Sequence, residues 1–216
     1  MRIALVNPNT SRATTEAMLG IAAETAGPRA TIVGVTAPFG APLIAEPQAL
    51  RVAANAVAAL SPKLTGADAV IIAAFGDPGL KLLRDRLDVP VTGIAEAGMA
   101  EAAARGRFAV VTTTPKLAPE IAAAAARYGH AGFAGTWTTP GEPASVMKDP
   151  TALQSALDLA ILKAVGEADV SAVVIGGGPL ATVARELAAK SPVPLIEPIP
   201  AAVRLSFARL GLTCPA

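Results

Sequence analysis

The sequence that decides the fold is Ile3-Ala4-Leu5-Val6-Asn7, a short apolar run that ends in a polar residue, and it returns as Phe108-Ala109-Val110-Val111-Thr112. Two further pairs lie about 104 residues apart in the same order: Val70-Ile71-Ile72-Ala73-Ala74 with Val173-Val174-Ile175-Gly176-Gly177, and Val89-Pro90-Val91 with Val193-Pro194-Leu195. Three matches in one order indicate an internal repeat, and a repeat indicates the architecture before any single residue is interpreted. We therefore predict two similar halves, residues 1–104 and 105–200, followed by a C-terminal helix and tail at residues 201–216.

Each predicted half alternates short apolar runs with segments of helical periodicity, which is typical of a parallel sheet with helices on both faces. The predicted fold class is therefore α/β, with two pseudosymmetric halves, each a parallel sheet flanked by helices. In the first half we expect strands at residues 2–6, 31–35, 69–73 and 89–94, and helices at residues 11–27, 47–60, 78–87 and 96–104. In the second half we expect strands at residues 108–111, 136–138, 172–175 and 194–196, and helices at residues 117–128, 150–167, 179–190 and 201–210. The last helix is expected to pack back onto the first half.

The composition narrows the class of protein and its partners. Hydrophobic residues make up 52% of the chain and aromatic residues 3%, so the apolar residues are mostly aliphatic, which suits helices packed on a buried sheet. The net charge is +1 and there is no basic run, so we expect no nucleic-acid partner. No apolar stretch is long enough to span a membrane. Cys214 is the only cysteine, which excludes an internal disulfide and a multi-cysteine metal site, and we expect a cytoplasmic protein.

The loops that follow the strands are the expected ligand site, because ligands of open parallel sheets bind beyond the carboxyl ends of the strands. We expect this site in the cleft between the halves. Asn9, Thr10, Thr113 and Thr114 are polar residues of two such loops and can hydrogen-bond a small ligand, although turn and N-cap chemistry also accounts for them. The other expected binding residues follow the neighbouring strands of each half: Ala74, Phe75, Gly76, Gly177 and Gly178.

Asp77-Pro78 and Gly178-Pro179 each place a proline just after a strand, at a predicted first helical position. The free backbone N–H groups and the helix dipole at such a position can bind a carboxylate or a similar anion. Proline also begins helices where no ligand binds, and each motif taken singly favours that simpler interpretation. Because the two motifs occupy equivalent places in the two halves, together they favour a ligand cleft between the halves.

Four segments resemble one known family. Ile3-Ala4-Leu5-Val6-Asn7-Pro8-Asn9-Thr10-Ser11 and Phe75-Gly76-Asp77-Pro78-Gly79-Leu80 are similar to the aspartate/glutamate/hydantoin racemase superfamily, and most similar to its hydantoin and allantoin racemase branch. Gly93-Ile94-Ala95-Glu96-Ala97 and Val110-Val111-Thr112-Thr113 extend the similarity over nearly the whole chain. The resemblance implies two pseudosymmetric α/β halves with the site between them, no metal, no organic cofactor, and a homo-oligomer.

The chain departs from this family at the two positions where the resemblance implies catalytic residues. The resemblance implies two catalytic cysteines, one per half, that lie on opposite faces of the substrate's α-carbon, so that one removes a proton and the other returns it. At the two corresponding positions this chain has Ala74 and Gly177. Neither side chain can carry a proton. The two-thiol mechanism is therefore absent.

Acidic residues are the candidate replacements for the thiols. We single out Asp77 and Glu197 as candidate catalytic residues at predicted strand ends, although helix capping or surface charge also explains each of them. We expect an enzyme that acts at the carbon next to a carbonyl or carboxylate of a small carboxylate, amino-acid derivative or cyclic amide, by lyase, deaminase or hydrolase chemistry. Two alternatives stay open: a true amino-acid or hydantoin racemase that uses other bases, and a catalytically silent protein that binds small carboxylates.

Overall fold

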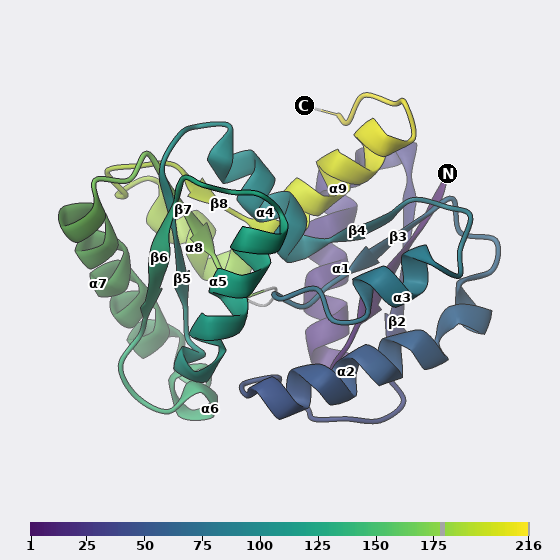
Figure 1. Cartoon of the computed structure of the whole chain (residues 1–216), viewed down its shortest axis with the longest axis horizontal. Coiled ribbons are helices and arrows are strands. Elements are labelled where there is room, and N and C mark those ends of the chain that lie inside the picture. Colours follow the sequence, from purple (N-terminus) through teal and green to yellow (C-terminus); the bar gives the residue numbers. More distant parts are fainter. Residues whose placement is uncertain (178–179, 216) are drawn as a thin grey trace.

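The structure is a computed structural model that describes residues 1–177 and 180–215. It contains two four-stranded parallel sheets with strand orders β2-β1-β3-β4 and β6-β5-β7-β8 (Figure 1). The strands are β1 (Arg2–Asn7), β2 (Thr31–Thr36), β3 (Ala69–Ile72), β4 (Val91–Gly93), β5 (Phe108–Thr112), β6 (Phe133–Thr138), β7 (Ala172–Ile175) and β8 (Leu195–Ile196). The helices are α1 (Arg12–Ala26), α2 (Pro47–Ala59), α3 (Leu80–Arg84), α4 (Ile94–Ala103), α5 (Ala118–Arg127), α6 (Pro143–Val146), α7 (Pro150–Ala168), α8 (Ala181–Ala188) and α9 (Pro198–Arg209).

The internal repeat explains why the two sheets have the same topology. β1 and β5 come from the first repeated stretch, and each pairs with a strand on both sides, β1 with β2 and β3, and β5 with β6 and β7. Ile3, Leu5, Phe108 and Val110 of these strands have no exposed surface. Strands that are covered on both faces are continuous apolar runs, as these are. The predicted α/β fold with two pseudosymmetric halves is confirmed.

Two helices pack across to the opposite sheet and join the halves. α4 follows β4 of the first sheet and contacts β7 and β8 of the second, whereas α9 follows β8 and contacts α1, β3 and β4 of the first (Figure 1). Gly98 of α4 permits this close approach, because an added Cβ would lie 3.1 Å from Cγ1 of Val174. Ile94 of α4 and Phe207 of α9 belong to a core cluster that includes residues of both sheets. The expected return of the last helix onto the first half is therefore confirmed, and the two halves share a core.

Near β4 the element boundaries differ from the predicted ones. The helix predicted at residues 78–87 is reduced to α3, because Asp77 and Gly79 take left-handed backbone conformations with φ of +54° and +77°. The chain therefore turns after β3 before a helix can start. The strand predicted at residues 89–94 ends at Gly93, whose backbone N–H donates to the side chain of Glu96 in a capping arrangement that begins α4.

In the second half the differences are smaller. β6 begins at Phe133, three residues before the predicted strand. α9 begins at Pro198 instead of position 201, which suits the fixed φ of proline in a first helical turn. Of the helix predicted at residues 179–190, α8 accounts for Ala181–Ala188, and position 179 lies outside the described residues.

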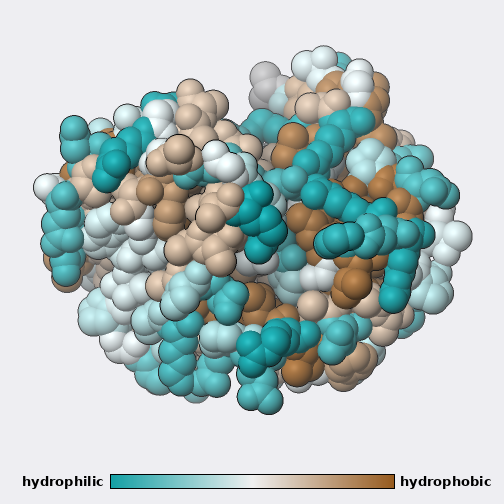
Figure 2. All heavy atoms as spheres, viewed as in Figure 1, coloured by the Kyte–Doolittle hydropathy of each residue, from teal (hydrophilic) through white to brown (hydrophobic). Residues whose placement is uncertain are grey.

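The helices and the surface of the described residues bear on membrane contact and assembly. None of their helices is both long and apolar enough to cross a bilayer. Figure 2 shows apolar and polar side chains interspersed on the face seen in Figure 1. Of the large apolar side chains that are exposed, Leu159 and Leu162 share α7 and the others lie in separate segments of the chain. The homo-oligomer expected from the resemblance stays a prediction.

Candidate active site

The carboxyl ends of four strands, two from each sheet, meet at a cavity of about 70 Å³. Its lining includes Asn9 after β1, residues 73–75 after β3, residues 113–114 after β5 and residues 176–177 after β7. A water molecule needs roughly 10–15 Å³ of such volume, so the cavity has room for several waters or a small ring. The site therefore lies between the halves, at the edge of the sheets where ligands of open α/β sheets bind.

The structure brings together part of the predicted set of site residues. The cavity is lined by Asn9, Ala74, Phe75, Thr113, Thr114 and Gly177. Thr10 and Glu197 do not line it, and Gly76 and Asp77 line a separate open groove on the surface. Gly178 lies outside the described residues. The helix start predicted at Asp77-Pro78 is wrong, because α3 begins only at Leu80 and is five residues long.

Sequence reasoning missed most of the apolar wall of the cavity. The residues missed are Thr14, Leu43, Ile44, Ala73, Leu117, Ile121, Met147, Gly176 and Leu180. Leu117 and Ile121 could have been found, because residues four apart share one helix face and this face follows a site loop directly. Leu43, Ile44 and Met147 lie outside or at the end of regular elements, where no periodicity marks the inward side.

Asn7 and Asn9 hold the loop after β1 in a fixed arrangement. Oδ1 of Asn9 accepts hydrogen bonds from Nδ2 of Asn7 and from the backbone N–H of Ser11, both at 2.9 Å. Oδ1 of Asn7 accepts from the backbone N–H of Asn9 at 3.1 Å. A backbone N–H can only donate, so these contacts fix which atom of each amide is the oxygen. Nδ2 of Asn9 bonds to none of the described residues, and it is therefore available to a ligand.

The loop after β5 carries the equivalent pair, Thr112 and Thr114. Oγ1 of Thr112 donates to the backbone carbonyl of Gly176 at 2.8 Å, and lies 3.0 Å from Oγ1 of Thr114. Thr112 is fully buried, and Thr114 is 8% exposed. These contacts join the end of β5 to the end of β7, so the lining residues of the second half are held to each other.

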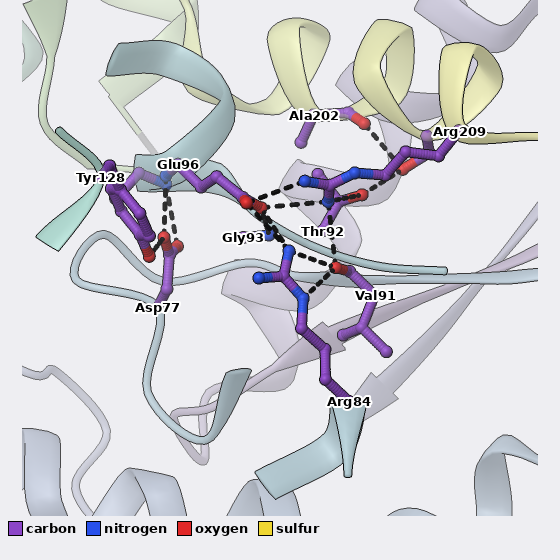
Figure 3. Close-up of polar contacts among 11 residues, drawn as sticks. Asp77, Arg84, Val91, Thr92, Gly93, Glu96, Tyr128, Ala202 and Arg209 are labelled. Atoms are coloured by element: carbon purple, nitrogen blue, oxygen red, sulfur yellow. Dashed lines mark hydrogen bonds and ion pairs between the residues drawn. The ribbon is translucent and has the colours of Figure 1, made fainter. Parts of the chain in front are cut away.

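Asp77 is buried next to the residues after β3 that line the cavity. Its side chain bonds the start of α4 and Tyr128 instead of pointing into the cavity lining. Its two carboxylate oxygens accept from the backbone N–H groups of Ala95 and Glu96 at 2.8 and 2.7 Å, and Oη of Tyr128 donates to it at 2.6 Å (Figure 3). An added Cβ on Gly93 would lie 2.1 Å from Cγ of Asp77, so only glycine fits there. Asp77 was expected to cap the helix after it, but it caps α4, which lies about 18 residues further on. Its expected catalytic role stays a prediction.

Burial raises the pKa values of both Asp77 and Tyr128. Burial raises the pKa of Asp77 to about 6, although the hydrogen bonds from Tyr128, Ala95 and Glu96 oppose the rise. The pKa of Tyr128 is raised by burial and by the neighbouring carboxylate. Tyr128 follows α5 of the second half and Asp77 follows β3 of the first, so the bond between them ties the halves together.

The other acidic residues near strand ends are held in ion pairs. Glu96 binds Arg84 at 2.7 Å and Arg209 at 2.8 Å (Figure 3). Burial alone would raise the pKa of Glu96, but the hydrogen bonds and charges of these arginines lower it. Glu197 pairs with Arg185 at 2.9 Å and occupies the N-cap position of α9. Neither carboxylate lines the cavity, and the catalytic role expected of Glu197 stays a prediction.

Comparison with known proteins decides the family. A family model described as Asp/Glu/Hydantoin racemase matches residues 3–206. The chain belongs to this family. Hydantoin racemase from Pseudomonas sp. strain NS671 is 30% identical over 210 residues, which are 95% of this chain and 84% of that protein. Hydantoin racemase from Paenarthrobacter aurescens is 28% identical over 218 residues, 98% of this chain and 92% of that protein. The structure of allantoin racemase from Klebsiella pneumoniae gives a TM-score of 0.91 at 32% identity and covers 100% of this chain and 90% of that one.

This racemase-family chain keeps the cleft without the expected thiols. Ala74 and Gly177, where the resemblance places the two cysteines, both line the cavity. The described lining residues include no Asp, Glu, His, Cys, Lys, Arg or Tyr. Three or more potential metal-binding side chains gather nowhere in the described ranges. The lining therefore offers neutral hydrogen-bonding groups on an apolar wall.

Proposed function

We propose that the chain binds a neutral cyclic amide or ureide of the hydantoin class in this cavity and promotes exchange of the proton on the carbon next to the carbonyl. The observation that carries the proposal is the uncharged polar lining, Asn9, Thr14, Thr113 and Thr114. A buried charge without a partner is costly, so such a cavity favours a neutral ring over an amino acid or a dicarboxylate. Membership of the Asp/Glu/hydantoin racemase family, with relatives named as hydantoin and allantoin racemases, supports this substrate class.

In the proposed reaction the protein stabilises charge and water carries the proton. Nδ2 of Asn9 donates to the ring carbonyl, and this bond strengthens as the C–H bond breaks and its electron pair moves onto the carbonyl oxygen as an enolate. A water in the cavity accepts the proton, and a water on either face returns it to the same carbon. The product is the mixture of both enantiomers. The lyase, deaminase or hydrolase preference expected from the missing thiols gains no support from the relatives, which are named as racemases.

A second candidate function follows from one specific observation. Since no titratable side chain is found among the described lining residues, the cavity can bind the same neutral ring without turning it over. The chain is then a binding protein that retains the racemase-family cleft. The two candidates share the ligand class and differ in the fate of the proton.

Proton NMR in deuterated water separates these candidates. An enantiopure 5-substituted hydantoin and allantoin are incubated with and without protein, and the signal of the α-proton and the optical rotation are followed together. We expect both to decay faster than in protein-free buffer. Ligand line-broadening without faster decay supports the binding protein, and ring opening or release of ammonia contradicts both candidates.

Matched asparagine variants tie the activity to the cavity. Asn9→Asp keeps the acceptor used by Asn7 and Ser11 but replaces the free donor by an oxygen, so exchange is expected to fall by on the order of tenfold to a hundredfold. Asn55→Asp makes the same chemical change on the exposed face of α2 and is expected to leave exchange unchanged. Equal activity of the two variants would remove Asn9 from the site.

A further inference from the structure

We infer that Thr112, which does not line the cavity, selects the ligand by fixing the direction of the hydrogen bond at Thr114. Thr112 is a positioning residue, because it acts through Thr114 and touches no ligand. The inference rests on the proposed function in one respect, namely that the cavity between the sheets is the ligand site. It adds a requirement that the uncharged lining alone does not impose: the ligand must present an N–H group to one side of the cavity.

The hydroxyl of Thr112 donates its single proton to one partner. A threonine hydroxyl has one proton to donate and two lone pairs. A carbonyl can only accept, so in the 2.8 Å contact with the backbone oxygen of Gly176 the proton comes from Thr112. Thr112 has no exposed surface, and no water can replace this partner. In its 3.0 Å contact with Oγ1 of Thr114, Thr112 therefore offers a lone pair, and Thr114 must donate.

The consequence falls on Thr114, which lines the cavity. Its only proton is given to Thr112, so toward a ligand its hydroxyl offers lone pairs alone. Turning the Thr114 proton toward the ligand would break the 3.0 Å bond, and the only donor left to the buried Thr112 oxygen would be the backbone N–H of Thr114 in a long 3.4 Å contact. Leaving a buried polar group poorly satisfied is costly. Thr114 is therefore held as an acceptor and favours a ligand N–H.

Asn9, which lines the same cavity from the first half, has the opposite polarity. Its oxygen is occupied by Asn7 and by the backbone N–H of Ser11, each at 2.9 Å, so a ligand meets the Nδ2 donor. Asn7 and Thr112 occupy equivalent ends of the repeated strands β1 and β5, and each bonds the side chain two residues further on. The repeat thus supplies one donor and one acceptor from corresponding positions.

A ligand that satisfies both atoms has a carbonyl for Asn9 and an N–H for Thr114. An amide edge within a small ring carries these two groups side by side. A ring ester of the same size has the carbonyl but places an oxygen lone pair against the lone pairs of Thr114, and a carboxylate does the same with a full charge. The hydrogen-bond chain from Gly176 through Thr112 to Thr114 therefore selects ring amides over ring esters and carboxylates.

The test compares two neutral rings that differ in one group, 2-pyrrolidinone and γ-butyrolactone, whose ring oxygen replaces the N–H. Ligand-observed NMR gives the affinity of each for the whole protein. We expect the wild-type protein to prefer the lactam by at least about tenfold, because the lactone leaves the Thr114 acceptor unmatched. In Thr112→Val the Thr114 hydroxyl is free to donate, and the preference is expected to fall below about threefold.

Three further variants separate selection from damage to the fold. Thr112→Ser keeps the hydroxyl and is expected to keep the preference. Thr114→Val retains the bond from Thr112 to Gly176 and removes the acceptor, so it is expected to lose the preference even if Thr112→Val does not fold. Thr92→Val is the matched control, because Thr92 is a fully buried threonine whose hydroxyl bonds Ser206 and Arg209 outside the cavity. Its preference is expected to equal that of the wild type.

The outcomes distinguish this inference from the proposed function. If the wild-type protein binds lactam and lactone equally, or if folded Thr112→Val keeps the tenfold preference, the role of Thr112 is wrong while the cavity remains the ligand site. If neither ring binds the wild-type protein, the proposed function fails and the inference fails with it. A preference that falls in Thr112→Val and Thr114→Val but not in Thr112→Ser or Thr92→Val supports the inference.

Discussion

The fold changes the titration of Asp77. Burial raises its pKa to about 6, whereas an aspartate in an unfolded chain titrates near ~3.9. The folded state thus binds this proton more tightly, so the contribution of Asp77 to stability is fully present below about pH 4 and is lost as the pH rises through about 6. Relative to wild type, Asp77→Asn should therefore gain on the order of 2 kcal/mol in free energy of unfolding between pH 4 and pH 7.

Denaturant unfolding at a series of pH values measures this difference. Asp85→Asn is the control, because Asp85 is exposed and paired with exposed Lys81 on α3. Its stability curve is expected to run parallel to that of the wild type. A parallel curve for Asp77→Asn as well would mean that the buried carboxylate titrates as it does in the unfolded chain.

The same residue shows the limit of reading side chains from sequence. Asp77 precedes a proline, and Asp before Pro predicts an N-cap for the following helix. Its partners are instead Ala95, Glu96 and Tyr128, 18 to 51 residues away. No local pattern encodes such partners. Asn9, Thr113 and Thr114 were predictable because loop polarity and strand ends are local, and they do line the cavity.

At the scale of elements, the thiols expected after β3 and β7 can be introduced by mutation. In the double variant Ala74→Cys with Gly177→Cys, a thiol would stand on each side of the cavity. Gly177 does not have a positive φ, so a side chain is not strained there, although its Cβ would lie 2.9 Å from Cδ1 of Leu180, which must shift. We expect α-proton exchange on an enantiopure 5-substituted hydantoin to rise above that of the wild type, as followed by NMR.

Alkylation provides the control for the double variant. Iodoacetamide should abolish the gain, because the thiolate is the reactive form. The wild-type activity should survive both iodoacetamide and Cys214→Ala, because Cys214 contacts the carbonyl of Thr25 at 3.6 Å and does not line the cavity. Inactivation of the wild-type protein that disappears in Cys214→Ala would show that the tail reaches the site.

At the scale of the whole molecule, the halves are not independent, although their boundaries at residues 104 and 200 stay a prediction. The sequence predicted two similar sheets and the return of α9 onto the first half, but it did not predict that α4 packs on the second sheet. The repeat shows only that α4 and α9 occupy corresponding positions in the two halves of the sequence. It does not show which sheet each helix covers. Fragments of residues 1–104 and 105–216 each lack a helix that covers their sheet.

We therefore expect neither fragment to unfold cooperatively by itself. Mixing or co-expressing them should restore a cooperative transition, because the core cluster contains residues of both, among them Ile3, Phe108 and Phe207. Circular dichroism during thermal unfolding measures this. A cooperative transition of residues 1–104 alone would show that the first half is an autonomous domain.

We propose that the cavity between the sheets binds the amide edge of a neutral ring. A crystal structure with hydantoin tests it most directly. The ring is predicted to lie between Ala74 and Gly177, with a carbonyl on Nδ2 of Asn9 and an N–H on Oγ1 of Thr114. A ring bound instead in the groove beside Asp77 and Tyr128, or an empty cavity at saturating hydantoin, would contradict the account.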